Sequence, residues 1–191
     1  MRLTLIAAVS AVALLGGAVQ ASAAAPLTTA SQATEYSDAQ LQAFGAAMAA
    51  VRAASPTDGS APTAEQQAAM AAAIEAAGMD IAAFNALATA VSTDEVLQAR
   101  LTVVSTPESP AGSVAASVTD AEVVQFGAAM TAVRAAMPAG GAAPTTEQQA
   151  AMAAGVSSSG LALDRFNAIA GAVGSDARLR ARLELAAVRG G

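Results

Sequence analysis

The sequence predicts an all-α protein: two homologous small helical bundles, of about four short helices each, in tandem after a cleaved signal peptide. Three observations lead to this prediction. Residues 37–104 align without a gap with residues 119–186, and 37 of the 68 aligned pairs are identical, which is typical of a duplicated unit. In each copy, bulky apolar residues recur at steps of three and four, the spacing of one helix face. No segment alternates apolar and polar residues convincingly enough to predict a strand.

Residues 1–23 are typical of a secretory signal peptide. One positive charge, Arg2, precedes an apolar run from Leu3 to Val19, and Ala21-Ser22-Ala23 then forms a small-x-small cleavage motif. We therefore expect cleavage after Ala23 and export to the periplasm or the cell exterior. A retained membrane anchor is the alternative, but the run is near the shortest workable span and no stop-transfer charges follow it.

The segments before and between the two copies set the predicted domain boundaries. The chain has no cysteine, which excludes a lipoprotein anchor and disulfide bonds. Residues 24–36 predict a flexible N-terminal lead. Residues 105–117 are rich in Ser, Pro, Gly and Ala and predict an extended linker. The predicted domains are helical repeat 1 over residues 37–104 and helical repeat 2 over residues 118–187.

The first helix of each copy is expected to begin at a capping box and to end before a proline. In a capping box, a hydroxyl side chain accepts from a free backbone N–H and a side chain three residues later reaches back. The predicted boxes are Ser37 with Gln40 and Thr119 with Glu122. The prolines are Pro56 and Pro138, which push the preceding residue out of the α region. The apolar faces are Leu41, Phe44, Met48 and Val51, and Val123, Phe126, Met130 and Val133.

The second helix begins in a segment that occurs twice with one difference, as APTAEQQAAMAA and as APTTEQQAAMAA. Its threonines, Thr63 and Thr145, are predicted N-caps, and glutamines three residues later complete the boxes. The residues expected to face inward are Met70 and Ile74, and Met152 and Val156. Gly78 and Gly160 are predicted left-handed C-caps, a conformation that is costly for residues with a Cβ.

The third and fourth helices follow closely in each copy. Asp80 is the expected cap of the third helix, whereas the second copy has Ala162 there and lacks that cap. The predicted stripes of the third helices are Ile81, Phe84, Leu87 and Val91, and Leu163, Phe166, Ile169 and Val173. Ser92 with Glu95, and Ser175 in the second copy, are the expected caps of the fourth helix. Each copy has few bulky apolar side chains, so we expect the copies to pack together or to form a homodimer.

Three motifs of each copy resemble the bacterial family called domain of unknown function 4168. In the first copy these are Ser37-Asp38, Gly78 to Leu87 with Phe84-Asn85, and Asp94 to Leu101 with Arg100; in the second, Thr119-Asp120, Gly160 to Ile169 with Phe166-Asn167, and Asp176 to Leu183 with Arg182. The resemblance covers about 140 residues. The stretch SPTDGSAPTAEQQ departs from the family, whose members carry a longer and more charged helical segment there. The resemblance implies an exported helical protein of unassigned activity and carries over no catalytic residue.

Composition argues against most chemistry. The chain has no His, Cys, Lys or Trp, so it offers no Ser–His or Cys–His pair, no Schiff-base lysine and no Cys or His zinc ligands. Basic residues are too few overall for a nucleic-acid surface. The carboxylates matched between copies all lie in predicted first turns, where they favour the helix dipole: Asp38 and Asp120, Glu65 and Glu147, and Asp94 and Asp176. The recurring methionines favour core packing over Cu(I) binding. We predict no catalytic residue, no cofactor and no metal.

Four matched polar residues remain as candidate structural or binding positions: Asn85, Asn167, Arg100 and Arg182. The structural interpretation is that each asparagine hydrogen-bonds the loop before its helix, with the arginine nearby; the functional one is a polar contact in a ligand groove. The arginines of the C-terminal helix predict either a solvated helix end or a surface for an anionic lipid or an acidic partner. Residues 35–108 carry a net charge of −7 and residues 118–191 a net charge of zero.

The sequence therefore supports a first hypothesis: an exported, non-enzymatic binding or interaction module. Its partner would be an unknown protein or envelope component, with no nucleic acid and no stable membrane span after signal cleavage. A structural or stress-related envelope protein without a discrete ligand is the alternative, and a carboxylate-based hydrolase is a third. A pocket shared by the two copies and lined by matched polar residues would favour the first hypothesis.

Overall fold

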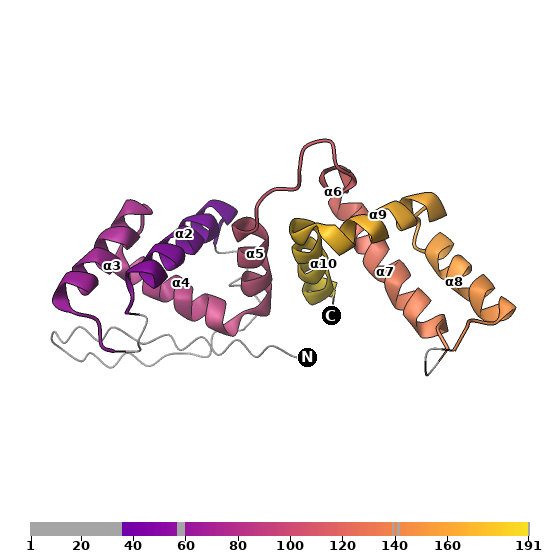
Figure 1. The fold of residues 1–191 in the computed structure, drawn as a ribbon, viewed down its shortest axis with the longest axis horizontal. Coiled ribbons are helices and arrows are strands. Elements are labelled where there is room, and N and C mark those ends of the chain that lie inside the picture. The colour runs from indigo at the N-terminus through magenta and orange to yellow at the C-terminus, as the bar shows by residue number, and fades with distance from the viewer. Residues whose placement is uncertain (1–35, 57–59, 139, 141, 191) are drawn as a thin grey trace, which may run out of the picture.

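The computed structural model describes residues 36–56, 60–138, 140 and 142–190. This part of the chain is all-α and contains no strand, which confirms the predicted fold class (Figure 1). The predicted signal peptide and nearly all of the predicted N-terminal lead lie outside the described residues. The division of the chain into two domains stays a prediction.

Helices of corresponding position recur in the two copies. The first copy contains α2 (Asp38–Ala54), α3 (Ala64–Ala76), α4 (Ile81–Thr93) and α5 (Glu95–Ser105). The second contains α7 (Asp120–Ala136), α8 (Thr146–Ser158), α9 (Leu163–Ser175) and α10 (Ala177–Gly190), and a short α6 (Val114–Ser117) precedes them.

The predicted capping boxes are present at the starts of α2, α3, α7 and α8. In the first copy of the repeated segment, the Gln66 backbone N–H donates to Thr63 Oγ1 at 3.2 Å, and the Thr63 N–H donates to Gln66 Oε1 at 2.9 Å. The segment has a structural role in both copies, because its capping box starts a helix. The C-caps are also as predicted: Gly78 has φ +76° and Gly160 has φ +87°.

The prediction for the start of the fourth helix was wrong. Asp94 caps α5 by accepting from the backbone N–H groups of Val96 and Leu97, and Asp176 caps α10 by accepting from Leu179. The serines thought to cap these helices, Ser92 and Ser175, belong to the preceding helix and donate back to its carbonyls. The third helix behaves as expected, because Asp80 caps α4 whereas α9 has no side-chain cap.

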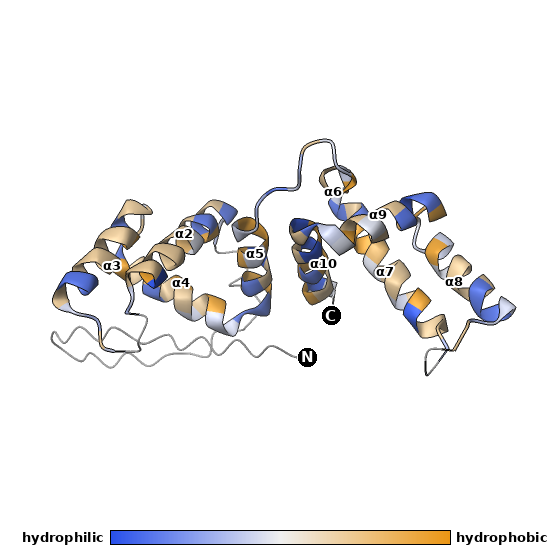
Figure 2. Cartoon of the chain, in the orientation of Figure 1, coloured by the Kyte–Doolittle hydropathy of each residue, from blue (hydrophilic) through white to orange (hydrophobic). Residues whose placement is uncertain are grey.

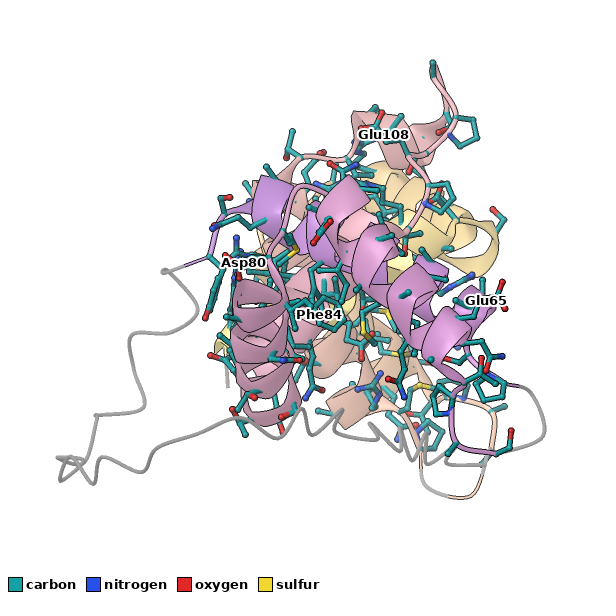
Figure 3. The ribbon with its side chains drawn as sticks, turned by 90° about the vertical axis from the view of Figure 1, so that its left-hand side faces the viewer. Glu65, Asp80, Phe84 and Glu108 are labelled. Atoms are coloured by element: carbon teal, nitrogen blue, oxygen red, sulfur yellow. The ribbon has the colours of Figure 1, made fainter. Side chains whose placement is uncertain are left out.

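Each copy has its own hydrophobic cluster, and a phenylalanine pair joins its first and third helices. The ring centroids of Phe44 and Phe84 lie 5.1 Å apart, and those of Phe126 and Phe166 also lie 5.1 Å apart. Figure 3 shows Phe84 in the interior of the first copy, with Glu65 and Asp80 at its margins, while Glu108 lies on the segment that leads to α6. The buried members are Leu41, Phe44, Ala47, Ile74, Phe84, Leu87, Ala90 and Leu97 in the first cluster, and Ala115, Val118, Val123, Phe126, Leu161, Ile169 and Leu179 in the second.

Two residues of the predicted stripes were wrongly placed in the core. Ile81 is 38% exposed and Leu163 is 54% exposed, although both carry the periodicity of their helix. Each is the first residue of its helix, and the residue two positions earlier packs on the cluster instead. In the first copy that residue is Met79, and in the second it is the buried Leu161.

The predicted linker is shorter than the range 105–117. Ser105 still belongs to α5, and residues 114–117 form α6, which Ser113 caps by accepting from the Ala116 N–H at 3.1 Å. Ala115 and Val118 are buried in the second cluster. This segment is folded because its apolar residues find a core, which a composition of small residues does not reveal.

The two copies meet through their fourth helices. In the first copy, α5 packs against α2 and α4; in the second, α10 packs against α7 and α9. The helices α5 and α10 also pack against each other and run in opposite directions in the middle of the molecule (Figure 1). Since each fourth helix contacts both its own copy and the other, it is the element that positions the candidate site.

Candidate functional site

Both candidate arginines are held by an aspartate at the start of the first helix of their own copy. Arg100 Nε donates to Asp38 Oδ1 at 3.2 Å, and its Nη2 contacts the same oxygen. Arg182 Nη2 donates to Asp120 Oδ1 at 2.7 Å. These matched ion pairs tie the fourth helix to the first. The aspartates also lie at helix N-termini, so they serve the helix dipole as predicted and, in addition, orient the arginines.

The structural interpretation of the asparagines was wrong. Asn85 and Asn167 are exposed, and neither side chain makes a hydrogen bond within the described residues. Only the Asn85 backbone carbonyl is engaged, as the acceptor for Thr89 Oγ1. Neither asparagine lines the groove described next, so the structure does not bring the asparagines and arginines together.

A groove of about 710 Å³ lies where the two copies meet. Both matched ion pairs line it, one from each copy. Its walls include aliphatic residues from four helices: Val103 and Val104 from α5, Ala115 from α6, Val123 and Val124 from α7, and Leu185 from α10. Its volume is within the range of small-molecule sites, about 300–1,000 Å³.

Two further arginines of α10 reach the groove, and one of them fixes the way the copies pack. Arg178 Nη1 donates to the carbonyl oxygens of Val103 at 2.8 Å and Thr106 at 2.7 Å, at the C-terminal end of α5. The Val103 carbonyl also accepts from the Thr106 backbone N–H at 3.3 Å, and the helix dipole makes this end of α5 negative, which suits a guanidinium group. For Arg178, the predicted solvated helix end was therefore wrong. Arg189 lies at the other end of α10 and is exposed.

The groove carries a different charge from the whole chain. Four arginines (Arg100, Arg178, Arg182 and Arg189) and three acids (Asp38, Glu108 and Asp120) line it, for a formal charge of 4 − 3 = +1. The whole chain has a net charge of −6. The hydropathy of the helices also differs: in Figure 2, α2, α3 and α4 are mostly tan because of their alanines, whereas α10 carries strongly hydrophilic residues.

A third ion pair, between Arg165 and Glu122, has no equivalent in the first copy and lies outside the groove. Arg165 of α9 donates from Nε to Glu122 Oε1 at 2.7 Å and from Nη2 to Glu122 Oε2 at 3.0 Å. Its Nη2 also donates to the Ser117 carbonyl at 3.1 Å. The hydrogen bonds from Arg165, followed by that from the Thr119 backbone, lower the pKa of Glu122 to about 2. The equivalent residues of the first copy, Gln40 and Ala83, cannot form this pair.

Within the described ranges, no group of three or more acidic side chains is placed to hold a metal ion. In the same part of the chain, no single helix has both the length and the apolar character needed to cross a bilayer. Taken together, α3 and α4 meet those criteria, but they are bent by 83° at the break between them.

Sequence reasoning missed the groove, although two of its signals were present. The residues of each ion pair are 62 positions apart and identical in both copies, which separates them from the many charges that differ. In addition, Arg178, Arg182, Leu185 and Arg189 follow steps of four, three and four, so they share one face of α10. The sequence contains no sign that this face turns toward the other copy.

No protein-family model, no curated protein and no solved structure matches this chain. The resemblance to domain of unknown function 4168 accordingly stays a prediction.

Proposed function

We propose that the protein is an exported, non-enzymatic binding module and that the groove between α5 and α10 is its site. The proposal combines the predicted leader peptide with the geometry of the groove. In this proposal the chain works as a tandem of two repeats, residues 37–104 and 118–187, in the periplasm or outside the cell. Its partner is a component of that compartment.

The single observation that carries the proposal is that matched polar residues from both copies line one groove. Asp38 with Arg100 and Asp120 with Arg182 are equivalent pairs, and they come together only because α5 packs on α10. A solvated surface without a discrete site would not need both pairs to be in one concave space. Binding sites typically combine apolar walls with a few convergent polar groups, which is the composition of this groove.

The carboxylates in the groove favour binding over hydrolysis. A carboxylate-based hydrolase needs two carboxyl groups that face each other across the substrate, with one of them able to donate a proton. Asp38 and Asp120 are instead each paired with an arginine. An ion pair of this kind suits orientation of the guanidinium groups toward a ligand.

The proposal can be tested by capture from a periplasmic extract, with identification of retained proteins and small molecules by mass spectrometry. The bait is the mature chain, compared with Val124→Asp in the groove and with Leu163→Asp as a matched control. Both side chains are exposed and aliphatic, at 61% and 54%, but only Val124 lines the groove. We expect a component that native protein and the Leu163 variant retain and the Val124 variant loses. If no component is retained, or if the Val124 variant retains the same set, the site is not the groove and the structural alternative is favoured.

A further inference from the structure

We infer that the groove binds an amphipathic carboxylate, a small aliphatic chain with one anionic head, on the side formed by α7 and α10. This inference rests on the proposed function and adds the chemical class of the ligand. It follows from the charge of the groove, from the donors that remain available there, and from the aliphatic surface beside them.

The charge of the groove favours an anion. Three of its four arginines lie on α10, and the first copy has Val96 at the position equivalent to Arg178. The positive excess therefore lies on the α10 side. In a chain with a net charge of −6, this is a local reversal of sign, and it attracts a negative group.

Guanidinium donors are available on that side. Arg182 has five N–H donors, and within the described residues it uses one of them, on Asp120. No buried side-chain nitrogen in the described part of the chain lacks a partner, so the remaining donors of Arg182 reach solvent. Arg189 is exposed and makes no hydrogen bond or ion pair to any described residue. Arginine pairs with a carboxylate through two parallel N–H···O bonds, which suits this head group.

The neighbouring wall is aliphatic and exposed. Val124 is 61% exposed and lies four residues after Asp120, so it is on the same face of α7 as the aspartate. Leu185 lies between Arg182 and Arg189 on the groove-facing stripe of α10. The first copy has Gln42 where the second has Val124. An inorganic anion would leave this apolar surface in water, whereas an aliphatic chain would cover it.

Isothermal titration of the mature chain with decanoate, below its micelle concentration, tests the inference. Two partial probes serve as controls: decanol has the aliphatic tail without the anionic head, and inorganic phosphate is an anion without an aliphatic tail. We expect one decanoate site per chain and at least about ten-fold weaker binding of either partial probe, since the site gains from both contacts. No decanoate binding, equal binding of decanol, or many decanoate sites per chain would overturn the inference.

Matched variants locate the site. Arg189→Gln and Val124→Ser should each weaken decanoate binding about five-fold, which corresponds to the loss of one exposed ion pair or one partly buried aliphatic contact. Arg134→Gln and Leu163→Ser change exposed residues of the same kinds outside the groove and should leave the affinity unchanged. Because all four side chains are exposed, thermal unfolding should be nearly the same in every variant. Equal affinities across the four variants would contradict the assignment.

This experiment separates the ligand class from the proposed function. If decanoate fails to bind but capture from the extract still depends on Val124, the groove is a binding site for other chemistry and only the inference is wrong. If neither decanoate nor any captured component depends on the groove residues, the proposed function is wrong as well.

Discussion

The two copies share one helical plan but hold it together by different means. The first copy relies on local caps and a more enclosed core: Asp80 caps α4, and both Met70 and Phe84 are buried. In the second copy the α9 cap is missing, and the equivalent Met152 and Phe166 are only partly buried. The second copy adds polar contacts between distant elements instead.

These added contacts come from arginines that the first copy does not have. Arg165 joins α9 to the start of α7, and Arg178 joins α10 to the end of α5. Arg180 Nη1 donates to the carbonyls of Val173 and Gly174 at 3.0 Å each, at the end of α9. The comparison indicates that most buried positions are apolar in both copies, with exchanges such as Leu41 for Val123 and Leu87 for Ile169, while most of the arginines that join the copies and line the groove belong to the second.

The matched leucines Leu97 and Leu179 test whether the cores are equivalent. Both are fully buried, so Leu97→Ala and Leu179→Ala should each lower the free energy of unfolding by about 3 kcal/mol. Urea unfolding followed by circular dichroism measures both. A markedly smaller loss for Leu179→Ala would mean that the second cluster contributes less to stability than its burial indicates.

The contact between the first and second helices of a copy differs between the two copies at one position, which is a glycine in the second. Gly155 of α8 replaces Ala73 of α3, and a Cβ at Gly155 would lie 2.7 Å from the Cβ of Ala132. Gly155→Ala should therefore destabilise the protein by about 2 kcal/mol, although alanine is the better helix former. Thermal unfolding reports the change. A stabilised Gly155→Ala variant would show that α7 and α8 can separate at no cost.

The ion pair of the second copy should make its stability depend on pH. The pKa of Glu122 is about 2 in the folded protein and about 4.5 in its ordinary state, so the stabilisation is present above pH 4.5 and is lost as the pH falls toward 2. Glu122→Gln should cost about 1 kcal/mol at neutral pH and almost nothing near the folded-state pKa. Urea unfolding of both proteins at the two pH values measures this. A difference that does not change with pH would contradict the role of the Arg165 pair.

The missing cap of α9 allows the smallest of these tests. Ala162→Asp should restore the cap present in the first copy and stabilise the protein by about 1 kcal/mol or less. Hydrogen exchange should slow at the Arg165 amide, which is equivalent to the Ala83 amide that Asp80 accepts from at 2.7 Å. In the native chain we expect faster amide hydrogen exchange at the start of α9 than at the start of α4. Equal exchange rates at the two helix starts would mean that the Asp80 cap does not slow exchange.

Features set by neighbouring residues were predictable from the sequence, and those set by distant residues were not. The capping boxes and Gly78 follow from chemistry within one turn, and the apolar stripes follow from helix periodicity. The misplaced caps show the limit of this reasoning, because Ser92 and Asp94 are both competent caps and only the bend between α4 and α5 selects the aspartate.

The candidate site depends on distances that the sequence does not encode locally. Arg100 was singled out because it recurs, but its partner Asp38 lies 62 residues away and was explained by the helix dipole alone. Asn85 recurs equally and proves exposed, so recurrence does not by itself distinguish a contact from a solvated residue. The groove follows from the pairing of α5 with α10, which no local pattern predicts.

The antiparallel pairing of two equivalent helices has one more consequence. In a dimer of identical chains, an interface of this kind is symmetric, and any substitution near its axis appears on both sides at once. Here both helices of the interface belong to one polypeptide, so Arg178 can occupy a position of α10 while Val96 occupies the equivalent position of α5. Covalent linkage thus frees equivalent positions of the two helices from having to match, so the α5 side and the α10 side of the groove can differ, whereas a symmetric dimer would have two identical half-sites.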